Sequence, residues 1–310
     1  MKGRILGILR AEKAVVSGEV LSAELSVSRV SVWKHIQKLK EFGYHIESTP
    51  KGYRLISDPD ALLPWEFPHR ESRIHYFDKV SSTMDIARDL ARKGCPGFTV
   101  VVAGEQTEGR GRLKRAWLSS SGGLYFTIVL RPQIPPILSA RVHLAAAVVL
   151  TRTLRRMFAV EAMVKWPNDI LVDDGKIAGM LTEMEAESDL VHFVNIGLGI
   201  NVNNDPTSME PTASSLKKIL GKKISRRGLL SEFMDEFENY MNRGSLDDVI
   251  PEWKRYARTL NRHVRIVTDR EIHEGIAVDV DDNGALILAL ADGSTQKVVH
   301  GDCFHQERSQ

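Results

Sequence analysis

The segment Glu108-Gly-Arg-Gly-Arg-Leu-Lys-Arg-Ala-Trp117 places four basic side chains and two glycines in front of a tryptophan. Glycine lets the backbone adopt positive φ or approach a ligand closely. Arginine carries a planar, permanently charged fork that fits carboxylate and phosphate oxygens. A cationic, glycine-containing loop between apolar strands predicts an anion-binding loop. A solvated basic surface loop is the alternative, because basic patches are common.

The composition of the 310-residue chain is that of an ordinary soluble protein, with 43% hydrophobic and 26% charged residues, and the length allows two or three domains. Cys95 and Cys303 are far apart and match no metal-binding or redox spacing, which indicates a reducing compartment. Charge interrupts the N-terminal apolar run too early for a signal peptide. No segment approaches the roughly 18 consecutive apolar residues of a membrane span. We therefore expect a cytoplasmic protein without a membrane partner.

The net charge of +2 is unevenly distributed along the chain. Residues 1–57 carry ten Lys and Arg against five Glu and no Asp, a balance of +5, which leaves −3 for the remainder. A basic head on a slightly acidic body is typical of a nucleic-acid-binding module attached to another domain.

Three short helices are predicted in this basic head. Residues 4–9 begin the first, residues 19–26 form the second, and Ser28 can cap a third helix over Arg29–Glu41. Two helices joined by a short turn, the second with small polar and basic groups near its start, indicate a helix-turn-helix for the major groove. The residues expected in its buried seam are Val20, Leu21 and Leu25 on the second helix, and Val30, Trp33, Ile36 and Leu39 on the third.

A hairpin follows the third helix. Residues 44–48 and 53–56 alternate like strands around the turn Thr49–Gly52, which predicts a wing with Lys51 at its tip. On the third helix, Val32 is expected to lie outside the buried seam. A helical packing domain with a solvated basic face is the alternative, and the bases that would be read are not visible. The residues expected to face DNA are Ser28, Arg29, Ser31, Lys34, His35, Lys38 and Lys51.

A strand-to-helix corner opens the body of the chain. A strand over Ile74–Val80 leads through Ser81–Asp85 into a helix that ends near Lys93. Ser82 or Thr83 would cap this helix and leave hydroxyl and N–H groups at its start, where an anion or a polar ligand head can bind. Plain N-capping explains the same residues equally well.

The remaining body alternates buried strands with a long core helix. Lys176 directly follows a tight turn, beside Gly179; an edge-strand lysine that discourages aggregation is its alternative reading. The expected strands are 98–103, 122–130, 164–166, 170–172, 176–183 and 193–202, and the expected helices are 139–158 and 225–243. Four further short strands at 263–267, 272–280, 285–290 and 296–299, separated by tight turns, predict a small β-barrel.

Four motifs occur in a recognisable order. They are Gln106-Thr-x-Gly-Arg-Gly-Arg112 with Trp117, Lys165-Trp-Pro-Asn-Asp169, Lys176-x-Ala-Gly179, and Asn195-Ile-Gly-x-Gly-Ile-Asn201. With them the chain resembles the bacterial biotin protein ligases. The basic head, with Ser28-Arg29 and Lys34–Leu39, is similar to the helix-turn-helix of the bifunctional ligase and biotin operon repressor group. The likeness spans essentially the whole chain.

This resemblance implies an α+β multidomain protein. A winged helix-turn-helix would occupy residues 1–60, a class II synthetase-like mixed α/β catalytic domain residues 70–258, and an SH3-like C-terminal β-barrel residues 261–308. The implied reaction has two steps: biotin and ATP with Mg²⁺ give biotinyl-5′-AMP and pyrophosphate, and a lysine of the biotin carboxyl carrier protein of acetyl-CoA carboxylase then attacks the mixed anhydride. Operator DNA and a ligand-promoted homodimer are the other implied partners, and no residues are assigned to a resident metal.

Carried over by motif, the resemblance also assigns site residues. The catalytic set is Lys176, Arg110, Arg112 and Asp169. The biotin set is Ser82, Thr83, Met84, Gln106, Arg110, Gly111, Arg112, Lys176 and Gly179. The nucleotide set is Arg110, Arg112, Arg115, Trp117, Asn168, Lys176 and Asn201.

The chain departs from the family pattern at a few positions. Met84 stands where asparagine is usual, so that one polar contact to biotin is lost or replaced. Lys114 and Ser120 replace a usual glycine and proline around the loop, and His305-Gln306 stands where Leu-Arg is common, which puts in doubt an arginine contact to the nucleotide from the barrel.

Three functions remain open from the sequence. The first is a biotin protein ligase that is also a biotin-responsive repressor, and the second is a ligase whose helix-turn-helix has no regulatory role. The third is a transcription factor that only senses biotin, which the presence of Arg110, Arg112 and Lys176 argues against. A lipoate ligase shares the implied catalytic fold, but its glycine-rich motif differs from Gln106–Arg112.

Overall fold

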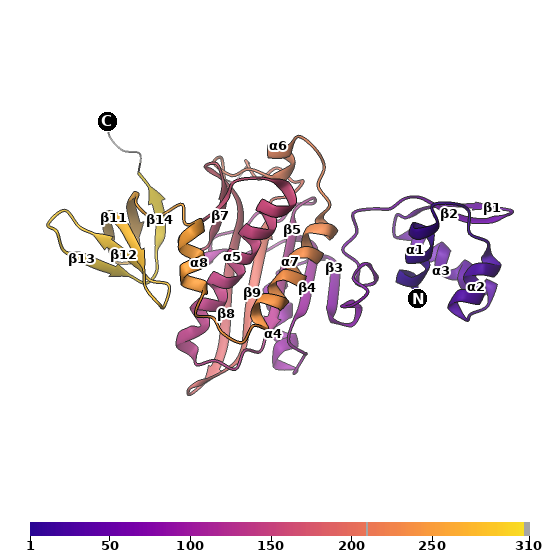
Figure 1. The fold of residues 1–310 in the computed structure, drawn as a ribbon, viewed down its shortest axis with the longest axis horizontal. Coiled ribbons are helices and arrows are strands. Elements are labelled where there is room, and N and C mark those ends of the chain that lie inside the picture. Colours follow the sequence, from indigo (N-terminus) through magenta and orange to yellow (C-terminus); the bar gives the residue numbers. More distant parts are fainter. Residues whose placement is uncertain (209, 307–310) are drawn as a thin grey trace. The chain divides into compact units, whose positions relative to one another are not determined.

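The computed structural model describes residues 1–208 and 210–306, apart from the side chain of Lys114. The last two residues of the barrel expected at 261–308 therefore lie outside the described part. The chain divides into two compact units, Met1–His75 and Tyr76–Gln310, whose elements are labelled in Figure 1.

The N-terminal unit consists of three helices and a hairpin. The elements are α1 (Lys2–Glu12), α2 (Gly18–Leu25), α3 (Arg29–Glu41), β1 (His45–Thr49) and β2 (Gly52–Ser57), followed by the 3₁₀ turns η1 (Pro64–Glu66) and η2 (Glu71–Arg73). The strands pair antiparallel around a turn that Gly52 closes with φ +141. The predicted helices and hairpin are confirmed as elements, and Ser28 caps α3 as expected, its Oγ accepting a hydrogen bond from Ser31 N at 3.2 Å.

The buried face of α3 differs from the predicted seam. Val32, Ile36 and Leu39 are buried, whereas Val30 is 63% and Trp33 51% exposed. Residues three apart drift round a helix of 3.6 residues per turn, while the spacing i, i+4, i+7 stays on one face. The expectation that Val30 and Trp33 point inward was wrong, as was the placement of Val32 outside the seam.

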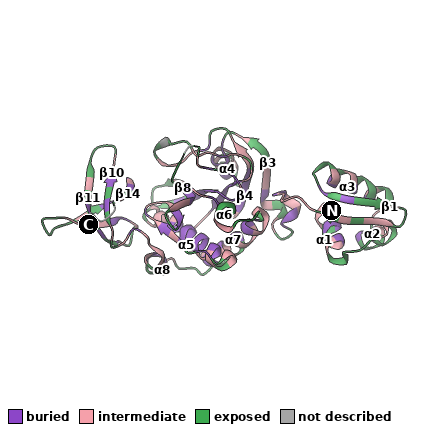
Figure 2. Ribbon diagram, turned by 90° about the horizontal axis from the view of Figure 1, so that it is seen from above, coloured by how far each residue is buried: buried purple, intermediate pink, exposed green. Residues whose placement is uncertain are grey.

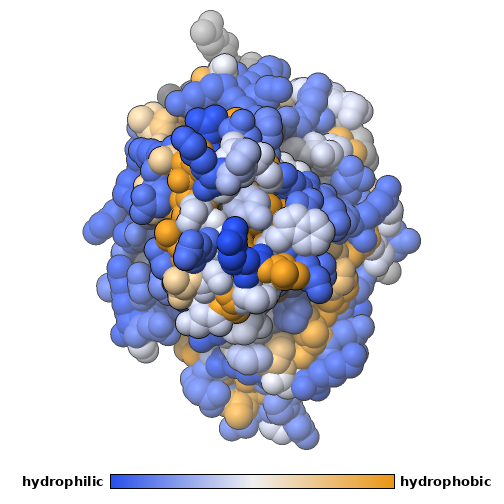
Figure 3. All heavy atoms as spheres, turned by 90° about the vertical axis from the view of Figure 1, so that its right-hand side faces the viewer, coloured by the Kyte–Doolittle hydropathy of each residue, from blue (hydrophilic) through white to orange (hydrophobic). Residues whose placement is uncertain are grey.

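The side chains predicted to face DNA lie on the surface of this unit. Ser28, Arg29, Lys34, Lys38 and Lys51 are exposed, and Ser31 and His35 are partly buried. Burial lowers the pKa of His35, as do the nearby charges of Lys2 and Lys38. Val20, expected inward, is 45% exposed. Figure 3 views the molecule from the side of this unit and shows a largely hydrophilic surface with some exposed hydrophobic side chains.

A seven-stranded sheet forms the centre of the second unit. The strands run in the order β3-β4-β5-β9-β8-β7-β6, and the pairs from β4 to β6 are antiparallel. Their bounds are β3 (Ile74–Val80), β4 (Thr99–Gln106), β5 (Leu124–Leu130), β6 (Ala162–Lys165), β7 (Asp169–Val172), β8 (Gly175–Glu187) and β9 (Leu190–Ile200).

Helices cover both faces of this sheet. On β5, Phe126 packs edge-on against Phe233 of α7 at 5.7 Å, whereas Thr127 hydrogen-bonds Thr83 at the start of α4. Successive strand residues point to opposite faces, so α7 and α4 lie on opposite sides. The helices are α4 (Thr83–Arg92), α5 (Ser139–Phe158), α6 (Leu216–Leu220), α7 (Arg226–Met241) and α8 (Val249–Tyr256), with the 3₁₀ turns η3 (Arg112–Lys114) and η4 (Pro136–Leu138).

The long helix α5 is the core helix of this unit. The stretch Pro136–Phe158 is long and apolar enough to cross a membrane, but 61% of its most apolar window is buried inside the unit. It packs against α7, α8 and the strands β6 to β8. Figure 2 shows buried residues along α5 and the central strands.

Five short strands form a separate antiparallel sheet at the C-terminal end. They are β10 (His263–Val267), β11 (Ile272–Val280), β12 (Leu286–Ala289), β13 (Thr295–Val298) and β14 (Asp302–His305), in the order β13-β12-β11-β10-β14. The first four were predicted and β14 was not. Within the described residues the outer strands β13 and β14 do not pair with each other, so the closure of this sheet into a barrel stays a prediction.

Candidate active site

A cavity of about 720 Å³ lies in the second unit. Its wall combines the start of α4, the basic loop after β4, the turn before β7, strands β8 and β9, and the end of the C-terminal sheet. Every residue predicted for catalysis, biotin or the nucleotide lines this cavity. The sheet therefore brings together four motifs that are widely separated in the sequence.

One end of the cavity is a chain of neutral hydrogen bonds. Thr127 Oγ1 donates to Thr83 Oγ1 at 2.8 Å, and Thr83 Oγ1 donates to Gln106 Oε1 at 3.1 Å. Gln106 Oε1 also accepts from Thr83 N at 2.8 Å, while Gln106 Nε2 donates to Ser119 Oγ at 2.9 Å. The chain joins α4, β4, β5 and the basic loop, and so fixes polar groups in place before a ligand binds. The sequence reading missed Thr127 and Ser119.

Capping and ligand binding are compatible at the strand-to-helix corner. Ser82 Oγ accepts a hydrogen bond from Met84 N at 3.3 Å and is therefore the cap, yet Ser82 and Thr83 both line the cavity. Met84 is 3% exposed and packs over β9, where a Cβ on Gly197 would lie 2.6 Å from Met84 Sδ. Met84 thus forms an apolar wall beside the polar end.

The basic loop closes on itself. Trp117 N donates to Gly109 O at 2.8 Å, and Gly111 N donates to Arg115 O at 2.8 Å. A Cβ on Gly109 would lie 2.5 Å from both Trp117 O and Ser119 Oγ. Gly109 therefore has no room for a side chain, because the loop's own backbone and Ser119 approach it closely.

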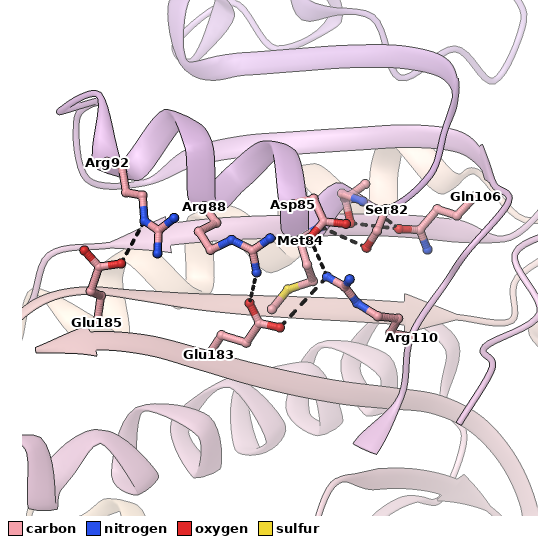
Figure 4. Close-up of polar contacts among 10 residues, drawn as sticks. Ser82, Met84, Asp85, Arg88, Arg92, Gln106, Arg110, Glu183 and Glu185 are labelled. Atoms are coloured by element: carbon pink, nitrogen blue, oxygen red, sulfur yellow. Dashed lines mark hydrogen bonds and ion pairs between the residues drawn. The ribbon is translucent and has the colours of Figure 1, made fainter. Parts of the chain in front are cut away.

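Arg110 belongs to a closed ring of four charged side chains. Arg110 Nη2 donates to Asp85 Oδ1 at 2.7 Å and lies 4.0 Å from Glu183 Oε1. Arg88 donates to the same Asp85 oxygen at 2.6 Å and to Glu183 Oε2 at 3.4 Å. Figure 4 shows the two guanidinium groups reaching these two carboxylates from α4 and the basic loop. The hydrogen bond that Arg110 donates to Asp85 is the main cause that raises the pKa of Arg110.

The other two arginines of the loop contact the C-terminal sheet. Arg112 Nη1 donates to Gly301 O at 3.1 Å, and Arg115 forms an ion pair with Asp302. Burial lowers the pKa of Arg112. Motif reading could not find Gly301 and Asp302, because they lie on or next to the unpredicted strand β14.

Trp117 packs flat against a pair of glycines. Gly179 on β8 and Gly199 on β9 face each other in register. A Cβ on Gly199 would lie 2.3 Å from Trp117 Nε1, and one on Gly179 would lie 2.8 Å from Trp117 Cζ3. The Lys176 ammonium stands 5.2 Å from the centre of a Trp117 ring. The two glycines are therefore required so that an aromatic side chain can rest on the sheet.

Lys176 forms an ion pair with Asp169. Lys176 Nζ lies 2.9 Å from Asp169 Oδ1, an ion pair whose angle falls outside hydrogen-bond geometry. Strand β8 lies between β7 and β9 in the sheet. The reading of Lys176 as an edge-strand lysine was therefore wrong. The sequence around a strand does not say which strands it pairs with, so this could not be predicted.

Asn168 and Asn201 use their amides within the protein. Asn168 Nδ2 donates to Met180 O at 3.0 Å, which ties the turn before β7 to β8. Asn201 Oδ1 accepts from Asn204 Nδ2 at 3.0 Å, and Asn201 is 2% exposed. Both residues shape the wall of the cavity.

His143 and His305 support the turn before β7, a role that the sequence did not indicate. His143 Nε2 lies 3.2 Å from Pro167 O and Nδ1 lies 2.8 Å from Thr182 Oγ1. A carbonyl only accepts, so Nε2 carries the proton and Nδ1 accepts from the threonine. Burial lowers the pKa of His143 to about 4. A lone histidine in the apolar sequence of α5 is the only signal that could have singled it out.

His305 acts on the other side of this turn. Its Nε2 lies 3.1 Å from Thr259 Oγ1, which accepts a hydrogen bond from Trp166 N at 3.0 Å. Burial is the main cause that lowers the pKa of His305 to about 4, and the charge of Lys165 adds to it. The departure His305-Gln306 thus brings a neutral histidine that links the C-terminal sheet to the Lys165–Asp169 motif.

One carboxylate of the cavity wall has the chemistry to hold a magnesium ion that arrives with a nucleotide. Within the described part of the chain, no cluster of three or more His, Cys, Asp or Glu could hold a metal ion. Mg²⁺ commonly binds through one or two carboxylates together with substrate phosphates and water. Asp169 supplies such a carboxylate in the wall of the cavity.

Three family profiles match successive parts of the chain. The biotin/lipoate A/B protein ligase family matches residues 76–201, an HTH domain matches residues 3–54, and the biotin protein ligase C-terminal domain matches residues 259–306.

The similar proteins span nearly the whole chain. The bifunctional ligase/repressor BirA of Bacillus subtilis is 36% identical over 300 residues, 92% of each chain. BirA of Escherichia coli is 29% identical over 288 residues, 88% of this chain and 87% of that one. The biotin protein ligase of Leishmania major in complex with biotinyl-5-AMP aligns with a TM-score of 0.54 and 26% identity over 73% of this chain and 98% of that one.

A likeness in fold extends to a structure with slightly lower sequence identity. The biotin protein ligase of Aquifex aeolicus in complex with biotin and ATP aligns with a TM-score of 0.64 and 24% identity, covering 75% of this chain and 98% of that one. The three profiles match in order along the chain, and the similar proteins cover nearly all of it. The ligase family match, residues 76–201, includes most of the cavity's lining residues. The chain therefore belongs to the biotin protein ligase family and is related along its length to the bifunctional ligase/repressors.

Proposed function

We propose that the protein is an ATP-dependent biotin protein ligase that also acts as a biotin-responsive transcriptional repressor. The observation that carries the enzymatic part is the cavity itself, which joins a neutral hydrogen-bonding end to a cationic wall of Arg112 and Lys176. A neutral, polar ring system with a carboxylate tail fits these two ends. The relatives named as ligases support the same reading.

In the first step, biotin lies with its ureido ring at the Thr83–Gln106 end. Its carboxylate reaches Lys176, and ATP places its α-phosphate beside the same cation. The carboxylate oxygen attacks the α-phosphorus, and pyrophosphate leaves. Two anions must be held together, so the protein contributes mostly positioning and charge stabilisation. Asp169 would hold Mg²⁺ together with the phosphates, and the ion would supply positive charge that neutralises the phosphates.

Trp117 and the walls made by Asn168 and Asn201 hold the nucleotide side of the cavity. The flat Trp117 ring offers a surface for the adenine, and Gly111 lets the loop backbone approach biotin closely. A closed loop also keeps water away from the mixed anhydride. The placement of these residues in the cavity wall supports these roles.

In the second step, a lysine amine of the biotin carboxyl carrier protein attacks the carbonyl carbon of the adenylate, and AMP leaves. The attacking amine must be neutral. Asp169, a carboxylate in the cavity wall that pairs with Lys176, can accept its proton once Lys176 has turned toward the adenylate.

The N-terminal unit is proposed to be a winged helix-turn-helix, with α3 in the major groove and the β1–β2 hairpin as the wing. Arg29, Lys34 and Lys38 on α3, and Lys51 on the hairpin, would contact the duplex. The adenylate would favour a homodimer that meets a two-part operator in the cytoplasm. Domain limits of 1–60, 70–258 and 261–308, the last as an SH3-like barrel, belong to this proposal.

The test of the ligase is transfer of labelled biotin to a carrier domain in the presence of ATP and Mg²⁺. Wild type should transfer biotin, and Lys176→Ala should lose most of the activity. Lys222→Ala, which removes an exposed lysine outside the cavity lining, is the matched control and should retain it. Failure of the wild-type protein with a verified carrier would overturn the proposal.

Two alternatives give different results in further assays. A ligase without a regulatory role would transfer biotin but show no gain of operator binding when biotin and ATP are added. A biotin-sensing transcription factor would bind biotin without releasing pyrophosphate. The retained Arg112 and Lys176 favour the ligase over a sensor.

A further inference from the structure

The four-residue charge ring at the edge of the cavity has no part in the reaction steps above. We call Asp85, Arg88, Arg110 and Glu183 the charge ring. Two of its members, Asp85 and Arg88, lie three residues apart on α4, and Glu183 lies on β8. Arg110 alone belongs to the loop between β4 and β5. The ring therefore joins the loop to two fixed elements of the sheet unit.

The contacts divide unevenly between the arginines. Both reach Asp85 Oδ1, Arg88 at 2.6 Å and Arg110 at 2.7 Å, so one carboxylate oxygen is shared by two cations. Glu183 completes the ring at 3.4 Å from Arg88 and 4.0 Å from Arg110. Two positive and two negative charges cancel within the ring, so Arg110 brings little free charge to a phosphate.

Arg112 differs from Arg110 in this respect. Among the described residues no carboxylate lies within ion-pair distance of Arg112, and its guanidinium meets the carbonyl of Gly301. Arg110 and Arg112 are separated by Gly111 alone, so a fixed Arg110 limits where the backbone of Gly111 and Arg112 can go. The two arginines of one motif therefore carry different tasks.

We propose that Asp85 and Glu183 are positioning residues that lock Arg110 and thereby hold the basic loop over the bound adenylate. This inference rests on the proposed function, because the intermediate to be retained is the one that the ligase makes. The contacts that hold Arg110 are ion pairs, and the side chains of Asp85 and Glu183 are 30% and 34% exposed to solvent. Salt therefore weakens these contacts.

The chain offers a matched control two residues further along β8. Glu185 pairs with Arg92 of α4 at 2.9 Å, which is again a helix-to-strand ion pair, but no loop residue takes part. Figure 4 shows both pairs side by side on the same helix and strand. Glu185→Gln therefore removes a comparable ion pair without touching the loop.

The experiment compares Asp85→Asn/Glu183→Gln with Glu185→Gln. Each protein is loaded with labelled biotin and ATP, separated from free ligand, and followed for release of biotinyl-5′-AMP without acceptor, from low to high salt. The double variant should release the adenylate about five- to tenfold faster than wild type at low salt, the range expected for losing a small ion-pair network. Wild type should approach the variant at high salt, whereas Glu185→Gln should match wild type throughout.

A second readout is independent of the reaction. Trypsin cleaves after Arg and Lys, and the ligand-free loop carries Arg112 and Arg115. Loop cleavage should be faster in the double variant than in Glu185→Gln, with the thermal midpoints of the two variants alike. Wild-type rates of both release and cleavage in the double variant would overturn the inference. Absence of any adenylate in wild type would instead overturn the proposed function, and the cleavage rates would still test the ring.

Discussion

The packing of Trp117 on the Gly179–Gly199 pair makes a sharp prediction for Gly199→Ala. The added Cβ would lie 2.3 Å from Trp117 Nε1 and 2.4 Å from Trp117 Cε2. Non-bonded heavy atoms settle at about 3.5–4.0 Å, so the ring must move by more than about 1 Å. A rigid indole cannot bend aside as a flexible side-chain end can, and the loop that carries it must shift with it.

Two magnitudes follow from this displacement. Overpacking of this kind costs about 1–3 kcal/mol, and a 1 Å misplacement in a catalytic site costs up to about 100-fold in rate. We expect kcat/KM for ATP to fall about 10- to 100-fold, while KM for biotin changes less, because the side chains of Thr83 and Gln106 are held by hydrogen bonds to each other, Thr127 and Ser119. Gly197→Ala is the matched control: its Cβ meets the flexible thioether of Met84 at 2.6 Å, so its effect should fall on biotin.

A double-mutant cycle with Trp117→Ala isolates the clash. Pyrophosphate release is measured for wild type, both single variants and the double variant across ATP concentrations. If the clash is with the indole, Gly199→Ala should cost little once the ring is absent, which gives a coupling of about 1–3 kcal/mol. Additive effects within about 0.5 kcal/mol would refute the reasoning.

Two further predictions concern pH and salt. The pKa of His143 falls from 6.5 to about 4 on folding, so the unfolded chain binds more protons than the folded chain between these pH values. The free energy of unfolding should therefore decrease as pH falls through that window, by about 3 kcal/mol. Denaturation of His143→Gln should show a shallower loss, and identical pH profiles would contradict this. For Lys38→Ala, the plot of log binding constant for duplex DNA against log salt should lose about 1 from its slope; Lys217→Ala, exposed in the other unit, should keep the wild-type slope.

Local patterns predicted most of the secondary structure. Helix α5 and strands β3, β10 and β11 have the expected bounds, because periodicity, caps and turn residues are encoded within each segment. The face of α3 was misjudged because Trp33 and Val32 both lie at helical spacings from Ile36, three and four residues before it. Only tertiary packing decides which of the two sets is buried.

The composition of the cavity was predictable for a different reason. Most of the residues that were assigned to the site fall in motifs whose order resembles a known family, and all of the assigned residues line one cavity. Their partners were not predictable, because they come from distant segments without a motif. Asp85 is 25 residues from Arg110, and Gly301 is 189 residues from Arg112.

These partners determine which cation an incoming anion can recruit. Arg110 faces two carboxylates, Arg115 faces Asp302, and Lys176 faces Asp169. Arg112 faces a carbonyl, whose partial charge holds a guanidinium less strongly than a carboxylate does. An anion therefore competes with a full negative charge at three of these cations and with a dipole at one. Arg112 should engage the phosphates first, and Lys176 should follow as the biotin carboxylate takes the place of Asp169.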